Sequence, residues 1–240
     1  MLTQVQLMQI IIQANNIYNG IFGQIMNNPN QFGAIYNDYV IRYNARNNYR
    51  NIVLVKYGCI PYFAIGEAPP PTTSGTYFYS TTAINNTAWF NVPLQHFFPT
   101  HAFLINSPRT PINKTLAIND LAGAGFYLDD ISPLPFMIKI NRSSVRYIKL
   151  MEYLFSNYFI PFVLTPICPL ICNAPIVRTI LMGTKVADRV VYDMITANLN
   201  ICNKIVLKPA GICGAMPRYT LSSACATNSP ILNLFNCAII

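Results

Sequence analysis

The chain has 240 residues, a net charge of +8 and only 10% charged residues, whereas a typical globular protein has about 25%. Its hydrophobic content of 52% supports a folded core and excludes intrinsic disorder, which requires low hydrophobicity. Residues 1–37, 68–108 and 153–177 contain no Asp, Glu, Lys or Arg. Because a soluble monomer keeps a charged surface that prevents association, this composition predicts a surface that is buried against other molecules.

In the N-terminal region, apolar residues recur at helical spacing over residues 3–26. Thr3 is the expected N-cap of this helix. Its polar face carries Gln and Asn without charge, whereas a membrane-surface helix normally carries Lys or Arg there. We expect the helix to pack on a neighbouring subunit or, equally, on the core of its own chain. A second helix is predicted over residues 38–50, so residues 1–50 form a helical arm.

The residue pattern changes after residue 50, because residues 51–208 contain short β-rich runs that are separated by turn signals. A spacing of about 8–12 residues favours antiparallel hairpins, because a parallel crossover needs a dozen or more residues. The sequence therefore predicts a mainly β domain, an antiparallel and jelly-roll-like β-sandwich with one or two further short helices, and α+β is the alternative. The predicted strands are residues 51–58, 62–66, 76–83, 87–94, 101–106, 114–119, 125–130, 136–141 and 176–183.

The C-terminal third begins with residues 141–155, which fit a helix. Residues 153–177 are long and apolar enough to raise the question of a membrane span. They contain four prolines, each of which costs about 3 kcal/mol inside a helix, so we expect a buried irregular β or loop segment and no membrane partner. Residues 186–199 fit either a helix or a strand, and residues 209–240 are predicted to form an irregular tail rich in Cys, Pro and Ala.

The seven cysteines are odd in number, and six of them follow residue 167. No C-x-x-C motif and no signal peptide accompanies them, which favours buried free thiols in a reducing compartment. A set of disulfides that forms when a particle leaves the cell is the alternative.

Groups that could perform catalysis are scarce, because the chain has two histidines, His96 and His101, and eight acidic residues. No zinc-binding spacing surrounds the histidines, so we expect a structural pair. Asp129 and Asp130 are interpreted as a solvated turn, with a divalent-cation site as the alternative, because hard cations prefer oxygen ligands. No nucleotide-binding glycine motif occurs. The sequence therefore predicts no enzyme, no cofactor, no metal site and no small-molecule substrate.

Two sets of three basic residues are the best candidate contact sites. The spacing of each set places its members on one helical face, and tyrosines between members of the first set could stack on bases. Few acids are present to pair with them in the same chain, so we predict contacts to nucleic acid or to neighbouring subunits. The first set is Arg42, Arg46 and Arg50, and the second is Arg142, Arg146 and Lys149.

The neutral polar residues favour assembly through large interfaces. The 15 tyrosines supply contact area, and Asn, Thr and Ser supply hydrogen bonds without the desolvation cost of buried charge. The sequence therefore predicts a structural protein of a virus particle, a capsid or shell component, with copies of itself and other shell proteins as partners. A nucleic-acid-binding core protein is one alternative. A helical arm on a β-sandwich is also similar in layout to the matrix proteins of viral occlusion crystals. The expected location is the virion, assembled in the host cytoplasm or nucleus.

Overall fold

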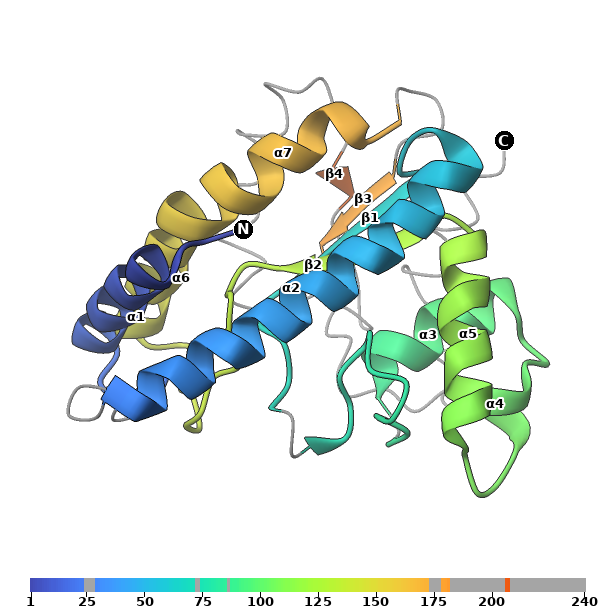
Figure 1. The fold of residues 1–240 in the computed structure, drawn as a ribbon, viewed down its shortest axis with the longest axis horizontal. Helices are drawn as coiled ribbons and strands as arrows, with labels where there is room; N and C mark the ends of the chain where they lie inside the picture. Colours follow the sequence, from blue (N-terminus) through green and yellow to red (C-terminus); the bar gives the residue numbers. More distant parts are fainter. Residues whose placement is uncertain (24–28, 72–73, 86, 173–177, 182–205, 208–240) are drawn as a thin grey trace.

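A parallel β-sheet forms the centre of the protein (Figure 1). The computed structural model describes residues 1–23, 29–71, 74–85, 87–172, 178–181 and 206–207. The described strands pair in the order β2-β1-β3-β4, and each pairing is parallel. The prediction of a mainly β, antiparallel sandwich is therefore wrong. The strands are β1 (Tyr62–Gly66), β2 (Phe126–Asp130), β3 (Arg178–Leu181) and β4 (Val206–Leu207).

Helices cover both faces of the sheet. Residues of α2 (Pro29–Tyr57) pack on one face, where the Tyr49 ring lies 6.4 Å from the Tyr127 ring. On the other face, Phe97 of α3 (Ala88–Phe97) packs edge-on against Tyr62 at 5.2 Å. All residues of β2 are buried, as is normal for a parallel strand between two helical layers. The strands predicted over residues 62–66 and 125–130 are thus confirmed as strands, but not as parts of hairpins.

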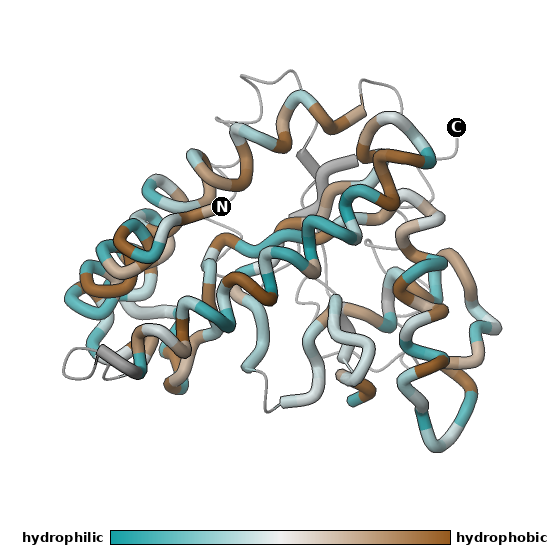
Figure 2. The backbone as a smooth tube through the Cα atoms, viewed as in Figure 1, coloured by the Kyte–Doolittle hydropathy of each residue, from teal (hydrophilic) through white to brown (hydrophobic). Residues whose placement is uncertain are grey.

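The long helix α2 contains both the helix predicted over residues 38–50 and the strand predicted over residues 51–58, and it runs across the boundary placed at residue 50. The strand prediction failed because Val53 is buried while Ile52 and Val55 are exposed, which is a helical pattern rather than an alternating one. Figure 2 shows polar and apolar positions alternating along this helix. Its buried stripe is Phe32, Tyr39, Arg42, Arg46, Tyr49 and Val53.

The connection from β1 to β2 is helical where three strands were predicted. Residues 87–94, 101–106 and 114–119 fall in α3, α4 (Ala102–Ile105) and α5 (Pro111–Gly123). The Thr110 side chain accepts a hydrogen bond from the Asn113 amide at 3.2 Å, and Pro111 occupies the first turn, so α5 begins with a helix-start signal. The buried residues of α5 also follow helical spacing: Lys114, Ala117, Ile118, Leu121 and Ala122.

The predicted N-terminal helix is confirmed as α1 (Gln4–Ile17), which ends earlier than expected. Thr3 caps it as predicted, because its hydroxyl accepts from the Gln6 amide at 3.2 Å and its own amide donates to the Gln6 side chain at 2.9 Å. Its apolar stripe contacts α6 (Val145–Leu154) and α2 of the same chain. Figure 1 shows α1 lying beside α6.

The proline-rich segment is helical rather than irregular from residue 153 to residue 170, and residues 173–177 lie outside the described part of the chain. The helix α6 continues as the π-helix η2 (Phe155–Leu164), then α7 (Thr165–Ile167) and the 3-10 turn η3 (Cys168–Leu170). The change to π geometry around Pro161 lets the helical path continue past a residue that has no amide proton. By length and composition, Val145–Leu170 could cross a membrane, but core helices meet the same criterion, and Phe155 and Phe159 are buried in this fold.

A disulfide joins Cys59 to Cys172 with a Cα–Cα distance of 5.0 Å. Beside it, Ile60 and Ile171 form a parallel β-bridge. The bond therefore fixes the end of the helical segment to the chain just before β1. The ranges 186–199 and 209–240 lie outside the described residues, as do the cysteines beyond Cys172.

Candidate functional site

The topology of the sheet points to its carboxyl edge. In the order β2-β1-β3-β4, the chain passes from β1 to β2 on one side of β1 and then returns to β3 on the other side, so the topological switch point lies between β1 and β3. In open α/β sheets, ligands bind outside the carboxyl ends of the strands at such a point. Gly66 and Glu67 after β1 border this point, whereas Asp129 and Asp130 at the end of β2 lie at the same edge of the sheet on the other side of β1.

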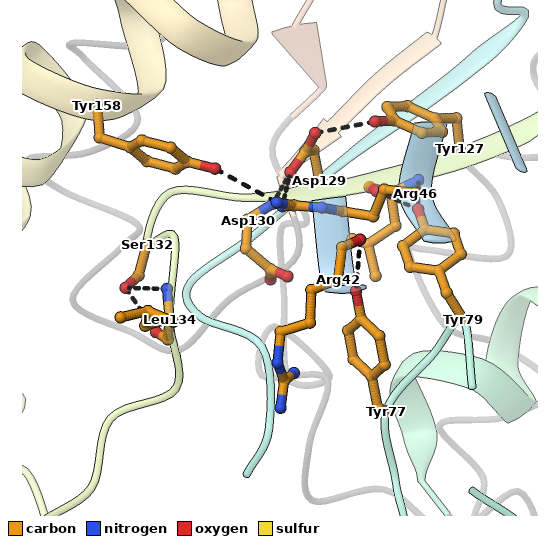
Figure 3. Close-up of polar contacts among 11 residues, drawn as sticks. Arg42, Arg46, Tyr77, Tyr79, Tyr127, Asp129, Asp130, Ser132, Leu134 and Tyr158 are labelled. Atoms are coloured by element: carbon orange, nitrogen blue, oxygen red, sulfur yellow. Dashed lines mark hydrogen bonds and ion pairs between the residues drawn. The ribbon is translucent and has the colours of Figure 1, made fainter. Parts of the chain in front are cut away.

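The two neighbouring aspartates point to opposite faces of the sheet, because side chains alternate along a strand. Asp129 faces α2, where it forms a buried ion pair with Arg46 (Figure 3). The Tyr127 hydroxyl donates to Asp129 Oδ2 at 2.9 Å, and Arg46 Nη2 donates to the Tyr158 hydroxyl at 3.4 Å. Burial lowers the pKa of Arg46, but the Asp129 carboxylate outweighs it and the pKa is raised well above its usual range. Arg46 therefore stays charged inside the fold.

Asp130 is buried on the other face, where its side chain lies directly over Gly66 of β1. A Cβ at Gly66 would overlap Oδ1 of Asp130, so the glycine provides the space for the carboxylate. The Asp130 amide donates to Asp129 Oδ1 at 2.9 Å, but no described residue donates a hydrogen bond to the Asp130 carboxylate. Burial raises the pKa of Asp130 to about 7, with Arg46 opposing the shift and Asp129 adding to it. Asp130 can therefore exchange a proton near neutral pH.

Arg42 lies one helical turn before Arg46 on α2, and in Figure 3 its guanidinium points away from the Asp130 carboxylate. Its Nε donates to Asp38 at 2.8 Å and its Nη1 donates to the Pro70 carbonyl at 3.1 Å. The guanidinium carbon stands 4.5 Å from the centre of the Tyr77 ring. Its Nη2 is buried and has no acceptor among the described residues. Arg42 thus anchors the loop that follows β1 and keeps one donor free.

The start of that loop is fixed by Glu67. Arg142 donates to both carboxylate oxygens, from Nη2 at 2.8 Å and from Nε at 2.9 Å, and the Tyr147 hydroxyl also donates to Glu67. The hydrogen bond to Glu67 raises the pKa of Arg142. Beyond the strands, the Ser132 amide donates to the Glu67 carbonyl at 3.0 Å. Both strand ends are therefore held rigidly, which is what a preorganised site requires.

Tyrosine side chains close the outer edge of the sheet. Among the described strands, β2 is at the edge, and the Leu128 amide donates to the Tyr79 hydroxyl at 3.0 Å, while this hydroxyl donates to the Leu128 carbonyl. The Tyr79 ring packs edge-on against Tyr49 at 4.9 Å and Phe78 at 4.7 Å. The loop after β1 is thus bound along β2 by an aromatic cluster.

The structure separates the six basic residues that were predicted as contact sites. Arg42 and Arg46 are buried with partners in their own chain, and Arg50 is partly buried with its Nη2 on Asn47. The second set does not share one helical face: Arg142 precedes α6 and binds Glu67. Arg146 and Lys149 are exposed on α6. Whether any of the six contacts nucleic acid or a neighbouring subunit stays a prediction.

The other candidates from the sequence lie elsewhere or differ from expectation. His96 is part of α3, where burial lowers its pKa, and His101 caps α4, with Nε2 3.2 Å from Asp120 Oδ2. Asp129 and Asp130 form a buried strand end instead of the solvated turn that was predicted. Within the described residues, no group of three or more His, Cys, Asp or Glu side chains is placed to hold a metal ion.

Comparison of the chain with protein-family models, with curated proteins and with solved structures found no match. The functional argument therefore depends on the geometry of the site. The sequence did contain one signal for it, because Gly66-Glu67 and Asp129-Asp130 each follow a short apolar run. We did not recognise this signal because we expected antiparallel hairpins, and only parallel strands bring their carboxyl ends to the same edge of a sheet.

Proposed function

We propose that this protein is an acid–base enzyme of the doubly wound α/β class, which binds a small polar group at the carboxyl ends of β1 and β2. The observation that carries the proposal is the Asp130 carboxylate, which lies over Gly66 at the carboxyl edge, one strand from the switch point, and receives no hydrogen bond from the described residues. The carboxylate oxygens are not among the fully enclosed polar atoms, so they are open to a partner from outside the chain, and their place at the edge where α/β proteins bind ligands favours a bound substrate or water.

The Asp130 carboxyl group defines the chemistry of the ligand. It accepts a proton as a carboxylate, and as an acid it donates through its hydroxyl and accepts through its other oxygen. A complementary group carries an N–H or O–H donor next to an acceptor oxygen. The edge of a cyclic amide or imide, as in the heterocyclic rings of nucleobases, offers this pair in one plane. Asp130 would then act as the base that takes a proton from the ligand or from an attacking water.

This proposal departs from the expectation of a non-enzymatic shell protein, which none of the comparisons tests. The shell-protein prediction depended on two observations, the expected β-sandwich and the low charge, and the structure contradicts the β-sandwich. The low charge remains, and a specific observation favours self-association as a second candidate function. Apolar side chains project from the outer side of α2, with Ile41, Ile52 and Val55 exposed by 67%, 44% and 89%. A virion location and shell or nucleic-acid partners stay predictions of that second candidate.

The test of the first candidate is a binding screen. Ligand-observed NMR with uracil, hydantoin, 2-pyrrolidone, succinate and inorganic phosphate is run on the wild type, on Asp130→Asn and on Glu152→Gln, whose exposed acid on α6 is the matched control. We expect the cyclic amides to bind and Asp130→Asn to weaken them about 10- to 100-fold, because a hydrogen bond to a charged group contributes about 1.5–3 kcal/mol. The proposal is contradicted if Asp130→Asn binds the cyclic amides as tightly as Glu152→Gln does.

The second candidate is tested by sedimentation. A shell component is expected to sediment as an oligomer and to become monomeric when Val55→Glu adds a charge to the outer side of α2. A wild type that stays monomeric at all accessible concentrations contradicts it, and this result leaves the ligand screen unaffected.

A further inference from the structure

We propose that the cavity between α2 and the η2–α7 segment is a second binding site, which takes a small oxyanion of the phosphate type. It lies on the α2 side of the sheet, whereas Asp130 lies on the opposite face. The proposal therefore does not depend on the ligand or the chemistry proposed for the carboxyl edge.

The cavity is large enough for a small ion, and polar groups line its α2 and β2 side, while apolar residues between 162 and 167 line the rest. Its volume is about 140 Å³, whereas one water needs about 10–15 Å³ on this scale. Arg46, Asn47 and Arg50 line it from α2, Asp129 lines it from β2, and Tyr158 lines it from η2. A cavity that stays dry is lined by apolar side chains alone.

The charges in this lining leave an excess cation. Asp129 pairs with Arg46 and so neutralises it. Arg50 has no carboxylate partner among the described residues, and its Nη2 is satisfied only by the neutral side-chain oxygen of Asn47. Its Nε is buried and has no acceptor in the described part of the chain. A buried guanidinium nitrogen without an acceptor is unfavourable, so an anion entering the cavity would satisfy it.

Tyr158 adds a second donor. Its hydroxyl accepts a hydrogen bond from Arg46 Nη2 at 3.4 Å, which leaves its own proton free to donate. Burial raises the pKa of Tyr158, so the hydroxyl keeps this proton over the ordinary pH range. The Tyr127 hydroxyl is different, because it already donates to Asp129. The free polar groups named here are therefore donors, which selects an anion over a cation.

The experiment is calorimetric titration of the full chain with sodium phosphate at constant ionic strength, with sodium chloride as the reference titration. The wild type is expected to bind phosphate saturably with one site per chain. Arg50→Gln is expected to weaken binding at least tenfold, and Tyr158→Phe about threefold. Arg146→Gln removes the same charge from the exposed side of α6 and is expected to bind like the wild type.

Two results would overturn the proposal. One is the absence of saturable phosphate binding to folded wild type, which would mean that the cavity holds water alone. The other is equal weakening of phosphate binding by Arg50→Gln and Arg146→Gln, which would mean that the affinity for phosphate depends on the net charge of the protein rather than on this cavity. Circular dichroism of each variant shows that it is folded, and Tyr158→Phe keeps the test decisive if Arg50→Gln does not fold, because its unchanged affinity would also contradict the site.

Discussion

Lys114 on α5 is a fully buried lysine whose replacement should stabilise the protein. Its Nζ stands 3.0 Å from the centre of the Phe90 ring and 5.2 Å from that of Phe103, and it has no hydrogen-bond acceptor among the described residues. Burial, with a smaller contribution from Arg109, lowers the pKa of Lys114 from 10.5 to about 6. The folded chain therefore binds fewer protons than the unfolded chain between these two values, and stability rises with pH across this window.

The magnitude follows from the pKa. At pH 7, the distance to the ordinary lysine pKa of 10.5 is about 3.5 units, which corresponds to about 5 kcal/mol of lost stability. Imperfect packing of a methionine in place of the lysine offsets about 1.5 kcal/mol of it. We therefore expect Lys114→Met to raise the free energy of unfolding at pH 7 by about 3 kcal/mol. This gain should shrink as the pH rises towards 10.

Urea unfolding monitored by circular dichroism at pH 6, 7, 8 and 9 measures this effect. The control is Lys149→Met, which removes an exposed lysine and is expected to change stability by no more than about 0.5 kcal/mol at any pH. The reasoning is refuted if Lys114→Met is less stable than the wild type, or if its advantage does not decrease from pH 6 to pH 9.

Three further substitutions test other contacts. Gly66→Ala places a Cβ against Asp130 and should cost about 1–3 kcal/mol in urea unfolding and abolish ligand binding at the carboxyl edge; an unchanged binding curve would contradict this. Tyr79→Phe leaves backbone groups at the edge of β2 unpaired and should lower the free energy of unfolding by about 1–3 kcal/mol, whereas a neutral effect would show that water replaces the hydroxyl. Cys59→Ser opens a disulfide with a sequence separation of 113 and should cost about 4–5 kcal/mol under oxidising conditions only; insensitivity of the wild type to dithiothreitol would mean that the bond with Cys172 does not form.

Local signals in the sequence identified individual elements better than they identified the architecture. The cap at Thr3, the helix over residues 38–50 and the strand runs at residues 62–66 and 125–130 were found because each depends on neighbouring residues alone. The pairing of strands depends on distant residues. Runs such as residues 114–119 contain β-prone and apolar side chains, and only the Thr110-Pro111 start signal could have shown that they are helical.

The candidate site was largely beyond sequence reasoning. Regular spacing correctly grouped Arg42 and Arg46 on one face of a helix, but it did not show that this face points inward to Asp129. The role of Asp130 depends on Gly66, which is 64 residues earlier and becomes its neighbour only through parallel pairing. The continuation of the helix through Pro161 was missed because proline was expected to end the helix, whereas the segment changes to π-helical geometry around it.

The most direct test of the acid–base site is a pH titration of the aspartate carboxyl carbons by NMR, with Asp130→Asn used to assign the Asp130 signal. We predict that this signal titrates near pH 7 and shifts when hydantoin or uracil is added, because burial raises the pKa of Asp130 and leaves its carboxylate open to a ligand. A midpoint below pH 5, together with no response to either compound, would contradict the proposed function.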